Sequence, residues 1–162
     1  MRKYISFFLC VFLSTFLVLP AFAQAPITLM MKQAEQGNAL SQYMLGVAYG
    51  IGEGVPKDDV KAAYWMEKSA NQDVAEAQTL MGTYYAKGQG VLKDYAKAAQ
   101  WFKKAADNGD DGGKALLGVF YLEGRGVTRD KQAGCMLLRE AMKQEGNHRG
   151  MAIKAYNTYC NN

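Results

Sequence analysis

The chain has 162 residues and a formal net charge of +4, from 19 lysines and arginines against 15 aspartates and glutamates. Cations and anions alternate along the predicted helices, which argues against nucleic acid or an anionic membrane surface as the partner. There is one histidine and no pair of cysteines at Cys-x-x-Cys spacing, so the residues offer no ordinary metal-ligand set. We therefore expect neither a metal nor a cofactor.

The first residues have the layout of a secretory signal peptide. Arg2 and Lys3 precede an apolar run over residues 4–19, and Ala21-Phe22-Ala23 follows as a small-x-small cleavage site. This order of basic, apolar and small residues is typical of a signal peptide. We expect residues 1–23 to be removed by a cut after Ala23, which makes the mature protein periplasmic or secreted.

An uncleaved membrane anchor is the alternative, but it needs about 20 apolar residues, and Pro20 and the cleavage site argue against it. The mature protein, residues 24–162, then has the length of one domain. Losing Arg2 and Lys3 lowers its formal charge to +2. We expect it to have no membrane partner after cleavage.

Two cysteines remain in the mature protein, Cys135 and Cys160. An even pair in an oxidising compartment predicts a disulfide. Closing a loop of about 25 residues would stabilise the fold by about 3 kcal/mol. The alternatives are a reactive thiol or a nucleophile pair of Cys135 with His148.

A repeat of 36 residues is the strongest feature of the sequence. The segment LGVAYGIGEGVPKD at residues 45–58 returns in related form at 81–94 and 117–130, and fifteen of the 34 positions from Gly37 to Ala70 recur identically 36 residues later. A fixed period of this size is typical of repeat units that bury their faces on one another. We place the units at about 37–72, 73–108 and 109–144.

The expected elements follow in chain order. Residues 24–27 form a loose lead-in, and a short helix runs from Thr28 to Gln36. In unit one, helix A covers residues 39–49, a glycine-rich loop covers 50–57, and Asp58 caps a helix B that ends near Ala70. The same plan places the helices of unit two at 74–87 and 94–106.

Unit three departs from the pattern, as terminal repeats do. Gly112 and Gly113 should soften the start of its helix A, and a last helix, within residues 147–160, caps the stack.

The spacing of apolar residues predicts the buried faces. On helix A of unit one the stripe comprises Ser41, Met44, Leu45, Ala48 and Tyr49. On helix B the inward residues are Val60, Ala63, Tyr64 and Trp65. Gly46 recurs inside helix A despite its cost of about 1 kcal/mol relative to alanine, which indicates that another helix backbone approaches closely there.

The Gly-x-Gly pairs, such as Gly52 and Gly54, are superficially similar to phosphate-binding loops. They leave a helix and recur at the repeat period, so a turn requirement explains them better.

The chain resembles the Sel-one-like repeat (SLR) family, α-solenoids related to tetratricopeptide repeats. The residues that carry the resemblance in unit one are Leu45, Gly46, Tyr49, Gly52, Gly54, Val55, Asp58, Lys61, Ala62 and Trp65. The resemblance implies an all-α solenoid of three helix hairpins with capping helices at both ends. It also implies a non-catalytic scaffold or adaptor that docks a protein partner in a concave groove.

We expect the groove to be lined by the side of each helix A that lies opposite its apolar stripe. The residues expected there are Gln42, Tyr43, Val47, Gln78, Thr79, Thr83, Lys114 and Val119.

Two sharper alternatives also come from the resemblance. One is an immunity protein that neutralises a toxin delivered to the periplasm, as some small exported members do. The other is a cysteine-containing protein that binds or hydrolyses β-lactams. The second is disfavoured because Ser69-Ala-Asn-Gln72 lacks the lysine of the Ser-x-x-Lys signature, and because units one and two contain no cysteine.

Overall fold

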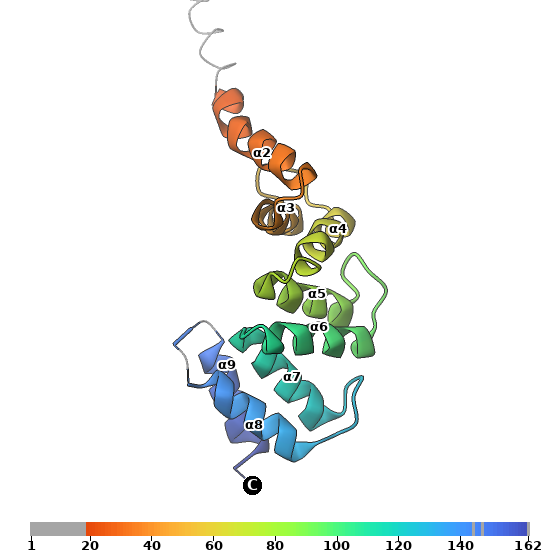
Figure 1. Cartoon of the computed structure of the whole chain (residues 1–162), viewed down its shortest axis with the longest axis vertical. Helices are drawn as coiled ribbons and strands as arrows, with labels where there is room; N and C mark the ends of the chain where they lie inside the picture. Colours follow the sequence, from red (N-terminus) through yellow and green to blue (C-terminus); the bar gives the residue numbers. More distant parts are fainter. Residues whose placement is uncertain (1–18, 144, 147, 162) are drawn as a thin grey trace, which may run out of the picture.

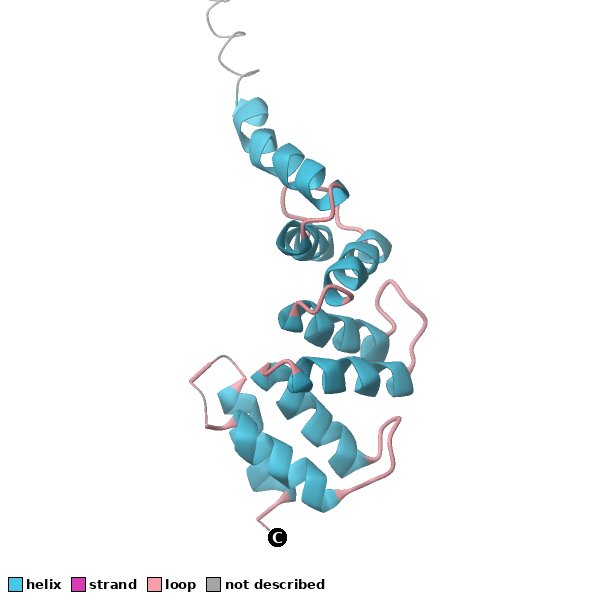
Figure 2. Cartoon of the chain, viewed as in Figure 1, coloured by secondary structure: helices cyan, strands magenta, loops and turns pink. Residues whose placement is uncertain are grey.

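The computed structural model describes residues 19–143, 145, 146 and 148–161, and every regular element in this part of the chain is an α-helix (Figure 2). The helices are α2 (Leu19–Glu35), α3 (Ala39–Ile51), α4 (Asp59–Ala70), α5 (Ala75–Lys87), α6 (Tyr95–Asp107), α7 (Asp111–Glu123), α8 (Lys131–Ala141) and α9 (Arg149–Tyr159). They follow one another along an elongated stack, from α2 at one end to α8 and α9 at the other (Figure 1). The predicted all-α solenoid is confirmed. None of the described helices is long and apolar enough to cross a bilayer.

Three helix hairpins form the body of the stack: α3–α4, α5–α6 and α7–α8. We call the first helix of each hairpin the A helix and the second the B helix. Each B helix begins after an aspartate, as predicted, because Asp58, Asp94 and Asp130 accept backbone N–H groups of the first turn at 2.9–3.0 Å. Besides its hairpin partner, α5 contacts α7, and α7 contacts α9. The contact between α5 and α7 is a direct contact between two A helices, and the capping helix α9 continues it beyond α7.

The N-terminal capping helix is longer than predicted. Residues 24–27, expected as a loose lead-in, belong to α2. Ile27 explains part of this difference, because its side chain is 8% exposed and packs in a core cluster with Ala34, Leu45 and Ala48. Most of the predicted signal peptide, residues 1–18, lies outside the described residues, and the cut after Ala23 stays a prediction.

The glycine inside each A helix is a point of close approach, as the sequence predicts. A Cβ atom on Gly46 would lie 3.2 Å from the carbonyl oxygen of Ala62, and one on Gly118 would lie 3.0 Å from that of Gly134. At Gly82 the added atom would press into the ring of Phe102. These glycines therefore set how closely the A and B helices of one hairpin can pack.

The predicted buried faces are only partly right. Met44 is 50% exposed, although Leu45 beside it is buried, and Val60 and Tyr64 on α4 are 67% and 51% exposed. The prediction for α4 was right for Ala63, which is buried, and wrong for Val60 and Tyr64. The helix packs against both α3 and α5, so its buried positions cluster around small residues. They are Ala62, Ala63, Met66, Ser69 and Ala70.

The C-terminal helix α9 is held by few contacts. Ala152 is its one buried residue, and the hydroxyl of Tyr159 donates to Glu123 on α7 at 2.7 Å. Cys135 on α8 is disulfide-bonded to Cys160 just beyond α9, with the Cα atoms 5.8 Å apart. The predicted disulfide is thus present in this structure.

The glycine pairs do form turns. All six glycines have positive φ values between 65° and 80°, a region that glycine enters without steric cost. The second glycine has a further role in units two and three. A Cβ atom on Gly90 would overlap the backbone of Asp59 at the start of α4, and one on Gly126 would overlap that of Tyr95 at the start of α6. The loop of one hairpin therefore packs on the preceding B helix.

Gly90 differs from Gly54 in this contact. Gly54 has a similar φ, but a Cβ atom there would meet only the side chain of Ile27, at 3.8 Å. We expect Gly90→Ala to lower the free energy of unfolding by about 2 kcal/mol more than Gly54→Ala, because the left-handed φ penalty is common to both and overpacking occurs only at Gly90. Urea unfolding followed by circular dichroism measures both values. Equal losses would contradict the packing role of the loop.

Candidate functional site

Two hollows lie along the A-helix side of the stack. The first, which we call the apolar hollow, has a volume of about 680 Å³ and lies between α2, α3 and the loop after α3. The side chains that give it its character are Leu29, Met30, Tyr43, Met44 and Val47. Leu29 is 57% exposed and Met44 is 50% exposed, so this hollow presents apolar surface to solvent.

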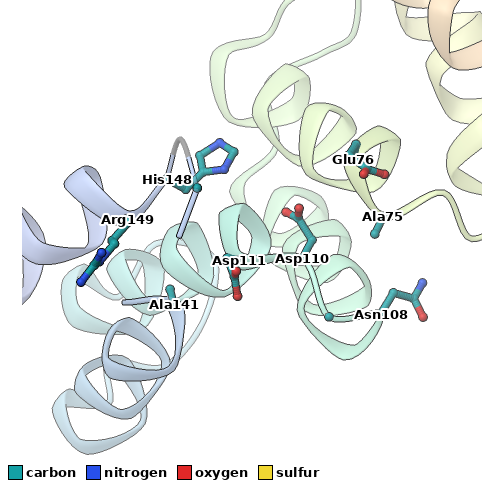
Figure 3. Close-up of a pocket in the computed structure, with 10 residues that line it drawn as sticks. Ala75, Glu76, Asn108, Asp110, Asp111, Ala141, His148 and Arg149 are labelled. Carbon is teal, nitrogen blue, oxygen red and sulfur yellow. The ribbon is translucent and has the colours of Figure 1, made fainter. Parts of the chain in front are cut away.

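The second hollow, which we call the acidic pocket, has a volume of about 320 Å³. It lies where the start of α5, the turn between α6 and α7, and the start of α9 come together (Figure 3). Its charged or titratable lining residues are Glu76, Asp110, Asp111, His148 and Arg149. Figure 3 shows Asp110 between His148 and Glu76 in this view.

Asp110 is fixed in place by its role as the N-cap of α7. Its Oδ2 atom accepts hydrogen bonds from the backbone N–H of Gly113 and the hydroxyl of Thr79, both at 2.6 Å. Neither donor carries a full charge, so these contacts and the helix N-terminus stabilise the carboxylate without giving it a cationic side-chain partner. Next to it, Asp111 is paired with Lys114 at 3.1 Å.

Gly112 gives the acidic pocket its shape. A Cβ atom at this position would lie 2.8 Å from the imidazole ring of His148 and 2.9 Å from Oδ2 of Asp110. The missing side chain therefore lets the histidine ring approach the aspartate. The glycine pair at 112 and 113 does not prevent helix formation there, since α7 begins at Asp111 and both glycines are buried.

Tyr43 links the two hollows. It lines the apolar hollow, yet its hydroxyl senses the charges of the acidic pocket. Burial raises the pKa of Tyr43, and the negative charges of Glu76 and Asp110 raise this pKa further. Tyr43 also packs against a core cluster that contains Ala77, the residue after Glu76 of the acidic pocket, so the two hollows approach each other at Tyr43.

Three of the eight residues predicted to face a partner are buried: Gln42, Gln78 and Thr79 are 3%, 0% and 6% exposed. The expected exposure of these three side chains was wrong. Thr79 is occupied by its hydrogen bond to Asp110.

The two glutamines form equivalent links between repeats. Gln42 donates from Nε2 to the carbonyl oxygen of Ala34 at 3.0 Å and accepts from Gln72 at 2.7 Å. Gln78 donates in the same way to Ala70 at 3.1 Å and accepts from Asn108 at 3.0 Å. Each glutamine thus satisfies the last carbonyl groups of the preceding helix and binds the turn of its own unit.

The other five predicted residues are intermediate in exposure. Thr83 donates to the carbonyl oxygen of Thr79, Lys114 pairs with Asp111, and Val119 packs against the cluster that joins α7, α8 and α9. Of the eight, only Tyr43 and Val47 line a hollow. A partner-binding role for these residues stays a prediction.

Sequence reasoning missed Leu29, Met44, Glu76 and Asp110. A signal was present for the last two, since Glu76 stands where unit one has Leu40, and Asp110 stands where unit two has Val74. Positions at which the repeats differ are not needed for the packing that all units share. Gln42 and Gln78 recur because each forms hydrogen bonds that join neighbouring helices.

Within the part of the chain that the structure describes, no three His, Cys, Asp or Glu side chains are grouped to hold a metal ion. The acidic pocket is lined mainly by polar side chains, and the apolar hollow combines apolar side chains with a few polar ones such as Gln33 and Glu53. Fold and site together define a helical-hairpin solenoid whose A-helix side offers surface for binding.

Comparison with known proteins agrees with this class. The family model described as Sel1 repeat matches residues 39–74, 75–110 and 113–145, and the chain belongs to the Sel1 repeat family. Proteins with Sel1 repeats are generally protein-interaction scaffolds. No curated protein matches the chain.

Solved structures with the same fold include two at more than 30% identity. A Sel1 repeat protein from Oxalobacter formigenes is 35% identical with a TM-score of 0.74, over 80% of this chain and 51% of that one. The protein c5321, a protective antigen of uropathogenic Escherichia coli strains that displays an SLR fold, is 32% identical with a TM-score of 0.70, over 80% of this chain and 32% of that one. The chain thus spans about a third to a half of the length of these relatives.

Cysteine rich protein B of Helicobacter pylori also matches, with a TM-score of 0.63 over 80% of this chain and 96% of that one. At 19% identity, this similarity shows the fold alone.

The hydrogen bonds of the buried Gln78 should contribute to the free energy of unfolding. We expect Gln78→Ala to lower the free energy of unfolding by about 2–3 kcal/mol, because it leaves the Ala70 carbonyl and the Asn108 amide without their partner and opens a small cavity. Gln100→Ala, at an exposed position of α6, is the matched control and should change stability by less than about 0.5 kcal/mol. Similar values for the two variants in urea unfolding would show that the link is not structural.

Proposed function

We propose that this chain is an exported, non-catalytic protein-binding module that docks a protein partner along its A-helix side. The observation that carries the proposal is the apolar hollow. Fully burying a side chain of the size of leucine or methionine is worth about 1.5–3 kcal/mol, and Leu29 and Met44 are only half buried in the free chain. A partner that covers them would gain part of this free energy.

Two observations support export. The signal peptide predicted at residues 1–23 provides the route, and the disulfide between Cys135 and Cys160 fits an oxidising compartment such as the periplasm or the cell exterior. The cysteine that could have served as a nucleophile is used in this bond, which supports a role in binding rather than catalysis.

The docking position can be tested by placing one negative charge in the hollow. We expect Met44→Asp to abolish capture of the native partner by the tagged, disulfide-bonded protein, because the charge would have to be buried on binding. Leu92→Asp is the matched control, since Leu92 is 91% exposed on a loop and lines neither hollow. Quantitative mass spectrometry of pull-downs from the native periplasm and culture medium compares the wild type with both variants.

A partner lost with Met44→Asp and kept with Leu92→Asp supports docking at the hollow. Identical partners for all three proteins would rule this position out. If the lost partner is a toxin delivered to the periplasm, and the chain protects cells that express it, the immunity hypothesis is supported as the sharper form of this proposal.

A further inference from the structure

Negatively charged side chains outnumber positively charged ones among the residues that line the two hollows. Four carboxylates line them, from Glu53, Glu76, Asp110 and Asp111, against the guanidinium of Arg149 and the imidazole of His148. The complete chain has a net positive formal charge. The A-helix side therefore gathers negative charge on a protein that is cationic as a whole.

Not all of this charge is compensated within the protein. Asp111 is paired with Lys114 at 3.1 Å, but Asp110 is held by a hydroxyl and a backbone N–H. Glu76, exposed on the first turn of α5, makes no hydrogen bond or ion pair with any residue that the structure describes. The guanidinium of Arg149 lies 3.9 Å from Glu145. The acidic pocket thus retains two carboxylates without a cationic partner.

The acidic pocket and the apolar hollow can be reached by one ligand. Tyr43 lines the hollow, and it also packs against a core cluster that contains Ala77 of α5, the residue after Glu76 of the acidic pocket. An extended peptide advances about 3.3 Å per residue. A spacer of a few residues would therefore carry a peptide from the hollow beside Tyr43 towards the pocket at Glu76, and its length is varied in the test below.

We propose that the partner segment docked on this face is an extended peptide in which an apolar side chain fills the hollow at Met44 and a lysine or arginine a few residues away enters the pocket at Glu76 and Asp110. This inference rests on the proposed function and names the chemistry of the partner. The apolar anchor supplies contact area, and the cation supplies direction and selectivity, because charge complementarity discriminates against wrong partners more than it adds affinity.

The shape of the pocket supports a long cationic side chain. The pocket has a volume of about 320 Å³, and Glu76 on α5 and Asp110 before α7 line it from two sides (Figure 3). An acidic segment would meet uncompensated carboxylates of like charge there. A purely apolar segment would leave these carboxylates without a partner.

Fluorescein-labelled peptides test the proposal on the disulfide-bonded protein. Each peptide carries a Leu-Phe pair, a Gly-Ser spacer of two, four or six residues, and a tail of Lys-Arg, Glu-Glu or Gly-Ser. Fluorescence anisotropy at low and at physiological salt gives the affinities. We expect the Lys-Arg peptide with the best spacer to bind about tenfold more tightly than the Glu-Glu peptide at low salt, with the preference falling as salt rises.

The variants separate the two parts of the site. Glu76→Gln should reduce the preference for Lys-Arg over Gly-Ser several-fold, and Glu67→Gln, an exposed glutamate of α4 that lines neither hollow, should leave it unchanged. Met44→Asp should weaken binding of the peptides that share the Leu-Phe pair.

Several results would overturn the inference. If the Lys-Arg and Gly-Ser peptides bind equally and both depend on Met44, the proposed docking function stands and the cationic preference is wrong. If no peptide binds at millimolar concentration, the inference fails whatever the pull-down shows. If sedimentation reveals a dimer that Met44→Asp dissociates, the hollow is an interface between two copies of this chain, and the peptide proposal is wrong.

Discussion

Close contact between the two helices of each hairpin is the constraint on which the rest of the structure depends. Gly46, Gly82 and Gly118 lie where a Cβ atom would meet the facing B helix. The glycine costs the isolated helix about 1 kcal/mol, and this cost is offset by burial of the B-helix residues Met66, Phe102 and Leu138, each at most 1% exposed. Because this packing is the same in all three units, the hairpins stack with a regular offset, and their A helices follow one another along one side.

Two further devices lock successive units together. The buried glutamines tie α3 and α5 to the end of the preceding helix, and the loop glycines at 90 and 126 let the loops of units two and three rest on the preceding B helix. Both devices recur at the repeat period, so the positions that hold the stack cannot also vary to suit a partner. The A-helix positions that do vary, Leu40 against Glu76 for example, are free to differ in chemistry, as the apolar hollow and the acidic pocket do.

The periodic features of this fold could be predicted from the sequence, and the features that occur once could not. The helix caps at Asp58, Asp94 and Asp130 and the turns at the glycine pairs follow from residue types that repeat, and the structure confirms them. Met44 was assigned to the core because a short helix with apolar residues on two sides has no single stripe. The acidic pocket was missed because it needs the position of α9, which has no equivalent in the repeat and therefore no periodic signal.

The central claim is that this protein acts by holding a partner on its A-helix side. Hydrogen–deuterium exchange of the chain with and without its native partner tests that claim most directly, because it reports which backbone amides the complex protects. The account predicts added protection in α2, α3, the first turns of α5 and the α6–α7 turn. Protection confined to α4, α6 and α8, with exchange in α3 and α5 unchanged, would contradict it.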